Sequence, residues 1–260
     1  MLRNYHSHTY RCNHAEGDAV DYAREAVKQG LTVLGVTDHT PLPDGRWSGM
    51  RMALSELPEY LDAIKLAQEA YSELRILKGM ECEWAEEYHS FYEEELLGRC
   101  ELDYLILGTH FFPCNGSWCG SHSGIYNAER LRAYTEHLIR SMESGLFAMV
   151  AHPDLFGLTY LEWDENTEAC TRDILKAAEE LQIPLEINGY GFRKRPIDTP
   201  SGPRPAYPWL PFWELAADYD IRVVVNSDAH TPAEVGASLK EGLQMAQMLG
   251  LKTANLEHLE

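Results

Sequence analysis

Short apolar runs alternate along this chain with longer segments of helical periodicity. This alternation is typical of parallel strands that are buried on both faces, because the crossover between two parallel strands is usually a helix. No linker, repeat or low-complexity tract interrupts the pattern over the 260 residues. We therefore predict an α/β fold in which residues 1–260 form one domain, built as a barrel of parallel strands.

The pattern also gives the expected position of each strand and helix. Seven strands are expected, at Leu2–Tyr5, Leu31–Val36, Arg75–Met80, Tyr104–Leu107, Phe147–Val150, Pro184–Ile187 and Ile221–Val225. The expected helices are Asp18–Gln29, Leu57–Leu74, Ala128–Ser144, Thr167–Leu181 and Ala233–Leu249. The stretch from Arg193 to Pro211 contains six prolines and should be irregular, because proline lacks the backbone donor that helices and sheets need.

Composition and charge exclude several classes of function. The chain is 45% apolar and 24% charged, as globular proteins are, and no apolar run reaches the roughly 18 residues of a membrane helix. Its formal net charge of -19 argues against nucleic acids and anionic membranes as partners, since both attract clustered Lys and Arg. A histidine motif begins at His6, too early for a secretion signal, so we expect a cytoplasmic protein with reduced cysteines.

Histidines and carboxylates follow the predicted strands. In a parallel barrel the C-terminal ends of all strands meet at one rim, so residues distant in sequence converge there. A buried cluster of this size without metal would leave polar groups unsatisfied at about 1 to 3 kcal/mol each. Because imidazole and carboxylate are the ligands that Zn, Fe and Mn prefer, we predict two or three divalent metal ions. The candidate ligands are His6, His8, His14, His39, Glu81, His110, His152, Asp228 and His230.

The motifs that carry these residues recur together in one known superfamily. They are His-Ser-His, Asn-His-Ala-Glu-Gly, Thr-Asp-His, Gly-Met-Glu, Gly-Thr-His, Ala-His-Pro-Asp and Ser-Asp-Ala-His, in this order. The chain resembles the PHP (polymerase and histidinol phosphatase) superfamily over residues 1 to about 250. Two further stretches, Met50 to Tyr60 and Gly191 to Arg193, resemble the monofunctional histidinol-phosphatase branch.

The resemblance implies a distorted (β/α)7 TIM-like barrel with a trinuclear metal site. By position, one ion would take His6, His8, Glu81 and Asp228, a second His14, His39 and His230, and a third His110 and His152, with Glu81 bridging the first and third. The implied activity is hydrolysis of histidinol phosphate in histidine biosynthesis. Another small phosphate ester or a nucleotide is the alternative substrate.

For such a phosphatase we expect a metal-held hydroxide to attack phosphorus, because bound divalent ions lower the pKa of water toward about 7. Arg193 is the first choice for a bidentate clamp on the phosphoryl oxygens, with Arg51 and Arg195 as secondary choices. Asp38 is expected to orient a ligand imidazole. Asp154 is a candidate proton donor to the leaving alkoxide, although aspartates after strands also often cap the next helix.

The remaining histidines lie on helical or polar sequence and are expected at the surface. They are His89, His122, His137 and His258. Of these, only His122 follows the fourth strand closely enough to contact the substrate. The aromatic residues after the proline-rich stretch, Trp209, Phe212 and Trp213, have near-helical spacing and are expected in the core.

Three other classes of protein compete with this interpretation. Amidohydrolases also begin with His-x-His on a barrel strand, but their bridging lysine has no counterpart after the fourth strand, where this chain has His110. A nuclease would need a basic stripe, which the sequence lacks. A regulatory module would be expected to have lost some ligands. A metal-dependent phosphatase acting on a small phosphorylated substrate therefore remains the preferred prediction.

Overall fold

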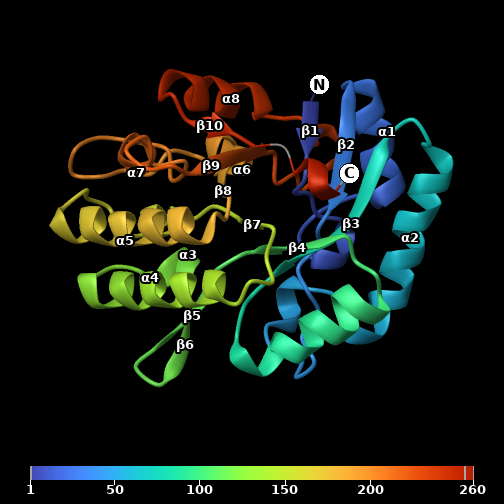
Figure 1. Ribbon diagram of the computed structural model, residues 1–260, viewed down its shortest axis with the longest axis horizontal. Coiled ribbons are helices and arrows are strands. Elements are labelled where there is room, and N and C mark those ends of the chain that lie inside the picture. Colours follow the sequence, from blue (N-terminus) through green and yellow to red (C-terminus); the bar gives the residue numbers. More distant parts are fainter. Residues whose placement is uncertain (1, 255, 260) are drawn as a thin grey trace. The chain divides into compact units, whose positions relative to one another are not determined.

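The structure is a computed structural model that describes residues 2–254 and 256–259. The chain divides into two compact units. Unit 1 comprises Met1–Ile106, Asn226–Lys240 and Asn255–Glu260, and unit 2 comprises Leu107–Val225 and Glu241–Ala254. Each unit has its own parallel strands with helices packed beside them (Figure 1).

In unit 1 the strands follow one another in chain order. They are β1 (Leu2–Asn4), β2 (Leu31–Val36), β3 (Arg75–Cys82) and β4 (Tyr104–Leu107), whose last residue belongs to unit 2. β1 pairs with β2 and β2 with β3, both in parallel. The crossovers contain α1 (Ala19–Lys28), α2 (Leu57–Ala70) and a π-helix at Phe91–Arg99. Figure 1 shows α1 and α2 beside β2 and β3, against which they pack.

One glycine in β2 allows a close approach inside unit 1. A Cβ on Gly35 would lie 1.9 Å from the Tyr104 hydroxyl and 2.9 Å from the backbone carbon of Tyr5. Because Gly35 has no Cβ, the Tyr104 hydroxyl can approach and donate a hydrogen bond of 2.6 Å to the carbonyl of Tyr5. This bond ties the end of β1 to β4, immediately before the first candidate ligands.

Unit 2 repeats the architecture with shorter strands. They are β7 (Met149–Val150), β8 (Leu185–Asn188), β9 (Arg222–Asn226, mostly in this unit) and β10 (Lys252–Thr253), and the pairs β7/β8 and β9/β10 are parallel. The longest helices, α4 (Ala128–Glu143) and α5 (Glu165–Leu181), lie side by side (Figure 1). The other helices are the short α3 (Ser121–Gly124) and α6 (Gly189–Arg193), α7 (Leu210–Ala216) and α8 (Leu239–Met248).

The strand predictions are confirmed and two additions stand out. All seven expected strands are present with ends shifted by at most two residues, while the short β10 is additional. An antiparallel hairpin of β5 (Phe111–Cys114) and β6 (Ser117–Gly120) was not predicted from the sequence. Asn115 and Gly116 between them have φ of 52° and 75°, the left-handed pair that a two-residue hairpin turn needs. The Asn-Gly dipeptide was therefore a usable signal.

The proline-rich stretch, the aromatic residues after it and the cysteines match the predictions, whereas one histidine does not. The proline-rich stretch is largely irregular between α6 and α7, and Trp209, Phe212 and Trp213 are buried, as predicted. The six cysteines are free thiols. The prediction for His137 was wrong: it lies on the inner face of α4, 5% exposed, with its ring against the edge of Trp118. Across residues 2–254 and 256–259, none of the helices combines the length and the apolar character needed to cross a membrane.

Candidate metal centre

Two buried asparagines bring the end of β1 against the segment after β9 within unit 1. The side-chain oxygen of Asn4 accepts from the amide of Ser227 at 2.7 Å, and that of Asn226 accepts from the amide of Tyr5 at 2.8 Å. The backbone pairing continues with an amide-to-carbonyl bond of 2.9 Å from His8 to Ala229. These bonds place His-Ser-His beside Ser-Asp-Ala-His, although more than 200 residues separate the two motifs.

The ends of β2 and β3 are joined in the same way. His39 and Glu81 form a parallel bridge, the amide of Glu81 donates to the carbonyl of Asp38 at 3.1 Å, and the amide of Thr40 donates to the carbonyl of Glu81 at 2.9 Å. Both Glu81 and His39 are buried. The parallel register therefore carries these two side chains to the same end of unit 1 as the two histidine motifs.

His6, His8, Glu81 and Asp228 form what we call the first cluster. The Nε2 atoms of His6 and His8 are 3.0 Å apart. Oε2 of Glu81 lies 3.5 Å from the first of these nitrogens and 3.4 Å from the second, and Oδ1 of Asp228 lies 3.5 and 3.1 Å from them. Five distances among four donor atoms thus fall between 3.0 and 3.5 Å.

These distances suit a shared cation. Two ligand atoms about 2.1 Å from an ion are about 3.0 Å apart at a right angle and about 3.4 Å apart at the tetrahedral angle. In addition, Nδ1 of His8 is buried and makes no hydrogen bond with any of the described residues. The chemistry of the donor set, two imidazoles and two carboxylates, fits a divalent ion of the Zn, Fe or Mn type.

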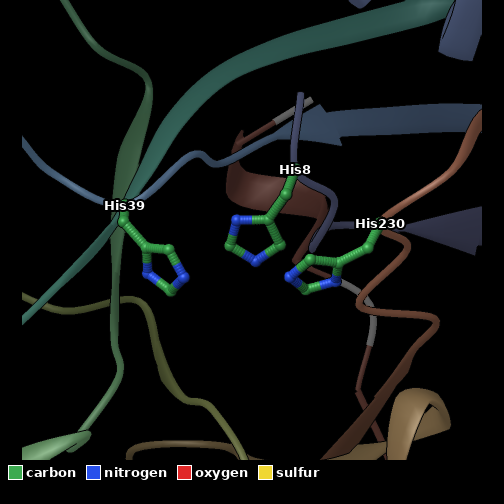
Figure 2. A group of neighbouring side chains, drawn as sticks. All are labelled: His8, His39 and His230. Carbon is green, nitrogen blue, oxygen red and sulfur yellow. The ribbon is translucent and has the colours of Figure 1, made fainter. Parts of the chain in front are cut away.

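His14, His39 and His230 form a second cluster next to the first. Figure 2 shows the rings of His8, His39 and His230 directed into one space, and their ligand atoms all lie within 4.8 Å of one another. Nε2 of His14 lies 3.2 Å from Nε2 of His230. Nδ1 of His39 lies 3.0 Å from Oε2 of Glu81, so this carboxylate reaches both clusters.

The ring tautomers in the second cluster follow from two backbone carbonyls. Nδ1 of His14 is 2.6 Å from the carbonyl oxygen of Cys12, and Nδ1 of His230 is 3.1 Å from that of Asp228. A carbonyl only accepts, so in both neutral rings Nδ1 carries the proton and Nε2 a lone pair. Two lone pairs that face each other across 3.2 Å repel, and a cation between them removes the repulsion.

The electrostatics of unit 1 favour neutral imidazoles at His8 and His230 and an ionised carboxylate at Asp228. Burial lowers the pKa of His230 to about 4 and also lowers the pKa of His8. Burial alone would raise the pKa of Asp228, but the imidazoles of His6, His8 and His230 outweigh it and hold that pKa well below its usual value. Neutral imidazole and ionised carboxylate are the forms that bind metal ions.

In unit 2, His110 and His152 lie next to each other. Their ring centroids are 4.9 Å apart, and the exposed His122 stacks on His110 at 5.7 Å. The amide of His152 donates to Oε2 of Glu186 at 3.0 Å. His152 has a φ of 30°, and Asp228 in unit 1 has 48°; non-glycine residues in this region are often found at functional sites. Glu81 as a bridge to a third ion stays a prediction.

Two buried residues near these clusters had no predicted role. Sγ of Cys12 lies within 4.8 Å of the ligand atoms of His14 and His230, and burial raises its pKa to about 12, so it is a thiol. Glu186 is fully buried and is the second residue of β8. Glu186 lies inside its strand rather than after it, so it gave no signal of the kind used for the candidate ligands. Cys12 had only its place two residues before His14.

The carboxylates and arginines predicted to assist catalysis occupy different environments. Asp38 accepts two hydrogen bonds from Thr9 and lies 3.9 Å from Nδ1 of His8, and burial raises its pKa to about 7. Arg51 is buried and donates to the carbonyl of Thr40, with Glu83 at 3.6 Å. These contacts hold the guanidinium in place, and its role as a phosphate ligand stays a prediction.

The other candidates lie in unit 2. Arg193 ends α6 with its guanidinium 5.3 Å from the ring centre of Tyr190, and Arg195 is exposed. Asp154 is fully buried, and burial raises its pKa to about 6 against the opposing bonds from the Trp209 amide and the Trp213 indole. The roles of these three residues in catalysis stay predictions.

Comparison with known sequences places the chain in a family. The profile of the PHP domain matches residues 4–189. The chain is 30% identical to a probable histidinol-phosphatase of Deinococcus radiodurans, over 99% of this chain and 97% of that protein. It is 26% identical to a histidinol-phosphatase of Bacillus subtilis, over 93% and 98%. The chain therefore belongs to the PHP family, which decides against the amidohydrolase interpretation.

Solved structures confirm the predicted fold. A putative histidinol phosphatase from Listeria monocytogenes superposes with a TM-score of 0.75 at 21% identity, over 92% of this chain and 99% of that one. The histidinol phosphate phosphatase of Lactococcus lactis, solved with Zn, L-histidinol and phosphate, gives a TM-score of 0.74 at 17% identity, over 96% and 94%. The chain thus has the α/β, TIM-like fold of these proteins.

Proposed function

We propose that this protein is a metal-dependent phosphomonoesterase whose preferred substrate is histidinol phosphate. The observation that carries the proposal is the first cluster, in which two imidazoles and two carboxylates lie at the mutual distances of ligands to one ion. Two of the relatives named above are histidinol-phosphatases, and one of these two was solved in complex with Zn, L-histidinol and phosphate. In this proposal residues 1–260 act as one PHP domain.

The ligands would divide among two or three ions. The first cluster would hold one ion, and His14, His39 and His230 a second. His110 and His152 would hold a third. Bound divalent ions supply a hydroxide at neutral pH and neutralise charge on the phosphoryl oxygens.

The surrounding residues of the chain would orient the ligands. The Nδ1–H groups of His14 and His230 are fixed by backbone carbonyls, so both rings present Nε2. Thr9 holds the carboxylate of Asp38 behind His8, where its ionised form would favour a basic imidazole. Arg193 would hold the phosphoryl oxygens with hydrogen bonds that strengthen as negative charge develops in the transition state.

The charge of the protein supports a substrate with a cationic alcohol half. Histidinol phosphate carries an ammonium group besides its phosphate, whereas generic phosphate esters do not. A chain with a formal net charge of -19 attracts the ammonium group and repels the phosphate, so it repels histidinol phosphate less than an ester that is a bare dianion. The metal ions would have to overcome that repulsion locally at the phosphate.

A panel of phosphomonoesters tests the proposal. The Mn-loaded protein is assayed with histidinol phosphate, p-nitrophenyl phosphate, glycerol phosphate and a nucleotide, before and after chelation. We expect histidinol phosphate to have the highest kcat/KM, and chelation to abolish turnover of every ester. If histidinol phosphate is hydrolysed no faster than the generic esters, the substrate assignment is wrong. If no ester is hydrolysed with any of Mn, Zn or Fe, the phosphatase assignment itself is wrong.

A further inference from the structure

Two segments of unit 2 interlock beside His152. One is the loop that follows β7, residues 153–161, and the other is the end of the proline-rich stretch, residues 204–209. Nη2 of Arg204 donates to the carbonyls of Gly157 at 2.8 Å and Tyr160 at 3.1 Å. Its guanidinium also stacks on the ring of Trp209 at 3.8 Å. One side chain of the second segment thus binds the backbone of the first.

Asp154 makes the reverse connection. Its Oδ2 accepts from the amide of Trp209 at 2.6 Å and from the indole nitrogen of Trp213 at 3.0 Å. The side chain is fully buried, so both bonds form away from water. Hydrogen bonds to a charged acceptor are stronger than those between neutral groups, which makes this carboxylate a strong anchor for the start of α7.

The two segments also pack without room to spare. A Cβ on Gly157 would lie 2.8 Å from the carbonyl oxygen of Ala206, and Leu155 forms an apolar cluster with Ala206 and Tyr207. The ring of Tyr207 lies 6.0 Å from the ring of His152. The segment that Asp154 and Arg204 hold therefore places the ring of Tyr207 beside His152, a candidate metal ligand.

We propose that Asp154 and Arg204 are positioning residues that hold Tyr207 against His152 and so fix the orientation of that imidazole. The inference rests on the proposed function, since it concerns a ligand of the proposed metal site. It also gives Asp154 a role other than the one that the sequence predicted, proton donation to the leaving alkoxide. The carboxylate of Asp154 accepts its two hydrogen bonds from Trp209 and Trp213, as a positioning role requires.

The leaving group distinguishes the two roles of Asp154. A proton donor matters for the alkoxide of histidinol phosphate but hardly for p-nitrophenolate, which leaves as an anion. We expect Asp154→Ala to slow both esters by the same factor, about 10-fold to 100-fold, the usual effect of losing a group that orients a ligand. Asp154→Asn, which keeps an acceptor oxygen, should recover most of the activity, with both limbs of the pH profile unchanged.

The opposite result would overturn the proposal. A general acid contributes about 10²-fold to 10⁴-fold, so a loss of that size in Asp154→Asn, confined to histidinol phosphate, identifies a proton donor. Arg204→Ala should reproduce the leaving-group independence of Asp154→Ala, because both act on the same segment. In the double variant the losses should be less than additive. Asp198→Ala, an exposed carboxylate of the same proline-rich stretch, is the matched control and should match the wild type.

A measurement without turnover separates this inference from the proposed function. Amide hydrogen exchange over residues 204–209 should be faster in Asp154→Ala and Arg204→Ala than in the wild type, and near wild type in Asp154→Asn and Asp198→Ala. Metal content per chain should fall in the first two variants only. If amide exchange is unchanged in both Asp154→Ala and Arg204→Ala, the positioning role of these residues is refuted, even if the protein is an active phosphatase. If exchange is faster in these two variants but the wild type has no phosphatase activity, the positioning role stands and the proposed function is refuted.

Discussion

At the scale of single residues, His8 has the most demanding surroundings. Its Nε2 faces another imidazole and two carboxylates within 3.0 to 3.4 Å, and burial lowers its pKa. In its neutral form a single Nε2 proton cannot satisfy three neighbours, and Nδ1 makes no hydrogen bond within the described part of the chain. A cation beside Nε2 resolves this arrangement, since it attracts all the donor atoms at once.

We predict that His8→Ala lowers both metal content and activity. Loss of a residue that merely orients a ligand costs about 10-fold to 100-fold in affinity or activity, so loss of a direct ligand should reduce kcat/KM by more than about 100-fold. Metal per chain is measured by mass spectrometry, and kcat/KM with histidinol phosphate. His89→Ala, on an exposed histidine, is the control. Full metal content in His8→Ala would remove His8 from the ligand set.

Arg193 should behave differently from the ligands. We predict that Arg193→Ala reduces kcat by about 10²-fold to 10³-fold, the usual effect of removing one donor to a developing negative charge. Metal content should not change, because a guanidinium carries no lone pair for an ion. The control is Arg172→Ala, an exposed arginine paired with Glu168 on α5. Kinetics equal to those of the wild type would rule out the phosphate clamp.

At the scale of secondary-structure elements, local rules account for most boundaries. Helix α5 begins where the side chain of Asp164 accepts from the amides of Asn166 and Thr167, and the hydroxyl of Tyr160 donates to the same carboxylate. Partial burial opposes ionisation of Asp164, but the Thr167 amide and the Tyr160 hydroxyl outweigh it and lower its pKa. A cap of this kind was readable from sequence, because Asp, Asn and Ser favour this position.

This cap gives a prediction for stability against pH. Asp164→Ala should lower the free energy of unfolding by about 1 kcal/mol at pH 7. A carboxylate whose folded pKa is depressed stabilises the fold above its unfolded pKa of about 3.9, and this contribution is lost as the pH falls through the folded pKa. The difference from wild type should therefore shrink below pH about 4. Urea unfolding at several pH values measures it, with the exposed Asp173→Ala as control; a difference constant down to pH 2 would contradict the assignment.

Element boundaries were less predictable where tertiary contacts decide them. The expected helix from Ala233 begins only at Leu239, because Pro232–Glu234 forms a short 3-10 turn instead. The π-helix Phe91–Arg99 was not predicted at all, since its apolar pattern is weak, although Tyr92 and Leu96 are buried. A helix whose sequence carries little apolar periodicity cannot be recognised from that periodicity.

At the scale of the whole molecule, bound metal should contribute to stability. A ligand that binds only the folded state stabilises it by RT ln(1 + [L]/Kd), about 4 kcal/mol at a free concentration a thousand times Kd. For a chain of this length 1 kcal/mol shifts the midpoint of thermal unfolding by roughly 2 to 4 °C, so we predict that chelation lowers Tm by about 10 °C. Scanning calorimetry with and without chelator measures the shift.

The same experiment has an internal control. Re-addition of Mn, Zn or Fe after the chelator is removed should restore Tm, and His8→Ala should show a smaller shift than the wild type. If chelation of the metal-loaded protein leaves Tm unchanged, metal ions bound at the two clusters do not stabilise the folded state. Their packing would then have to rest on protonated imidazoles, contrary to the lowered pKa values of His8 and His230.

The sequence alone determined the order of strands, the family and the list of histidines and carboxylates after each strand. These properties are local: a buried strand is written in a few consecutive residues, and a parallel topology sends every strand end to one edge. Only the tertiary structure decided which atoms face one another. The tautomers of His14 and His230, the burial of His137 and the bonds of Asp154 to residues 55 and 59 positions away depend on contacts between distant segments, which no window of sequence contains.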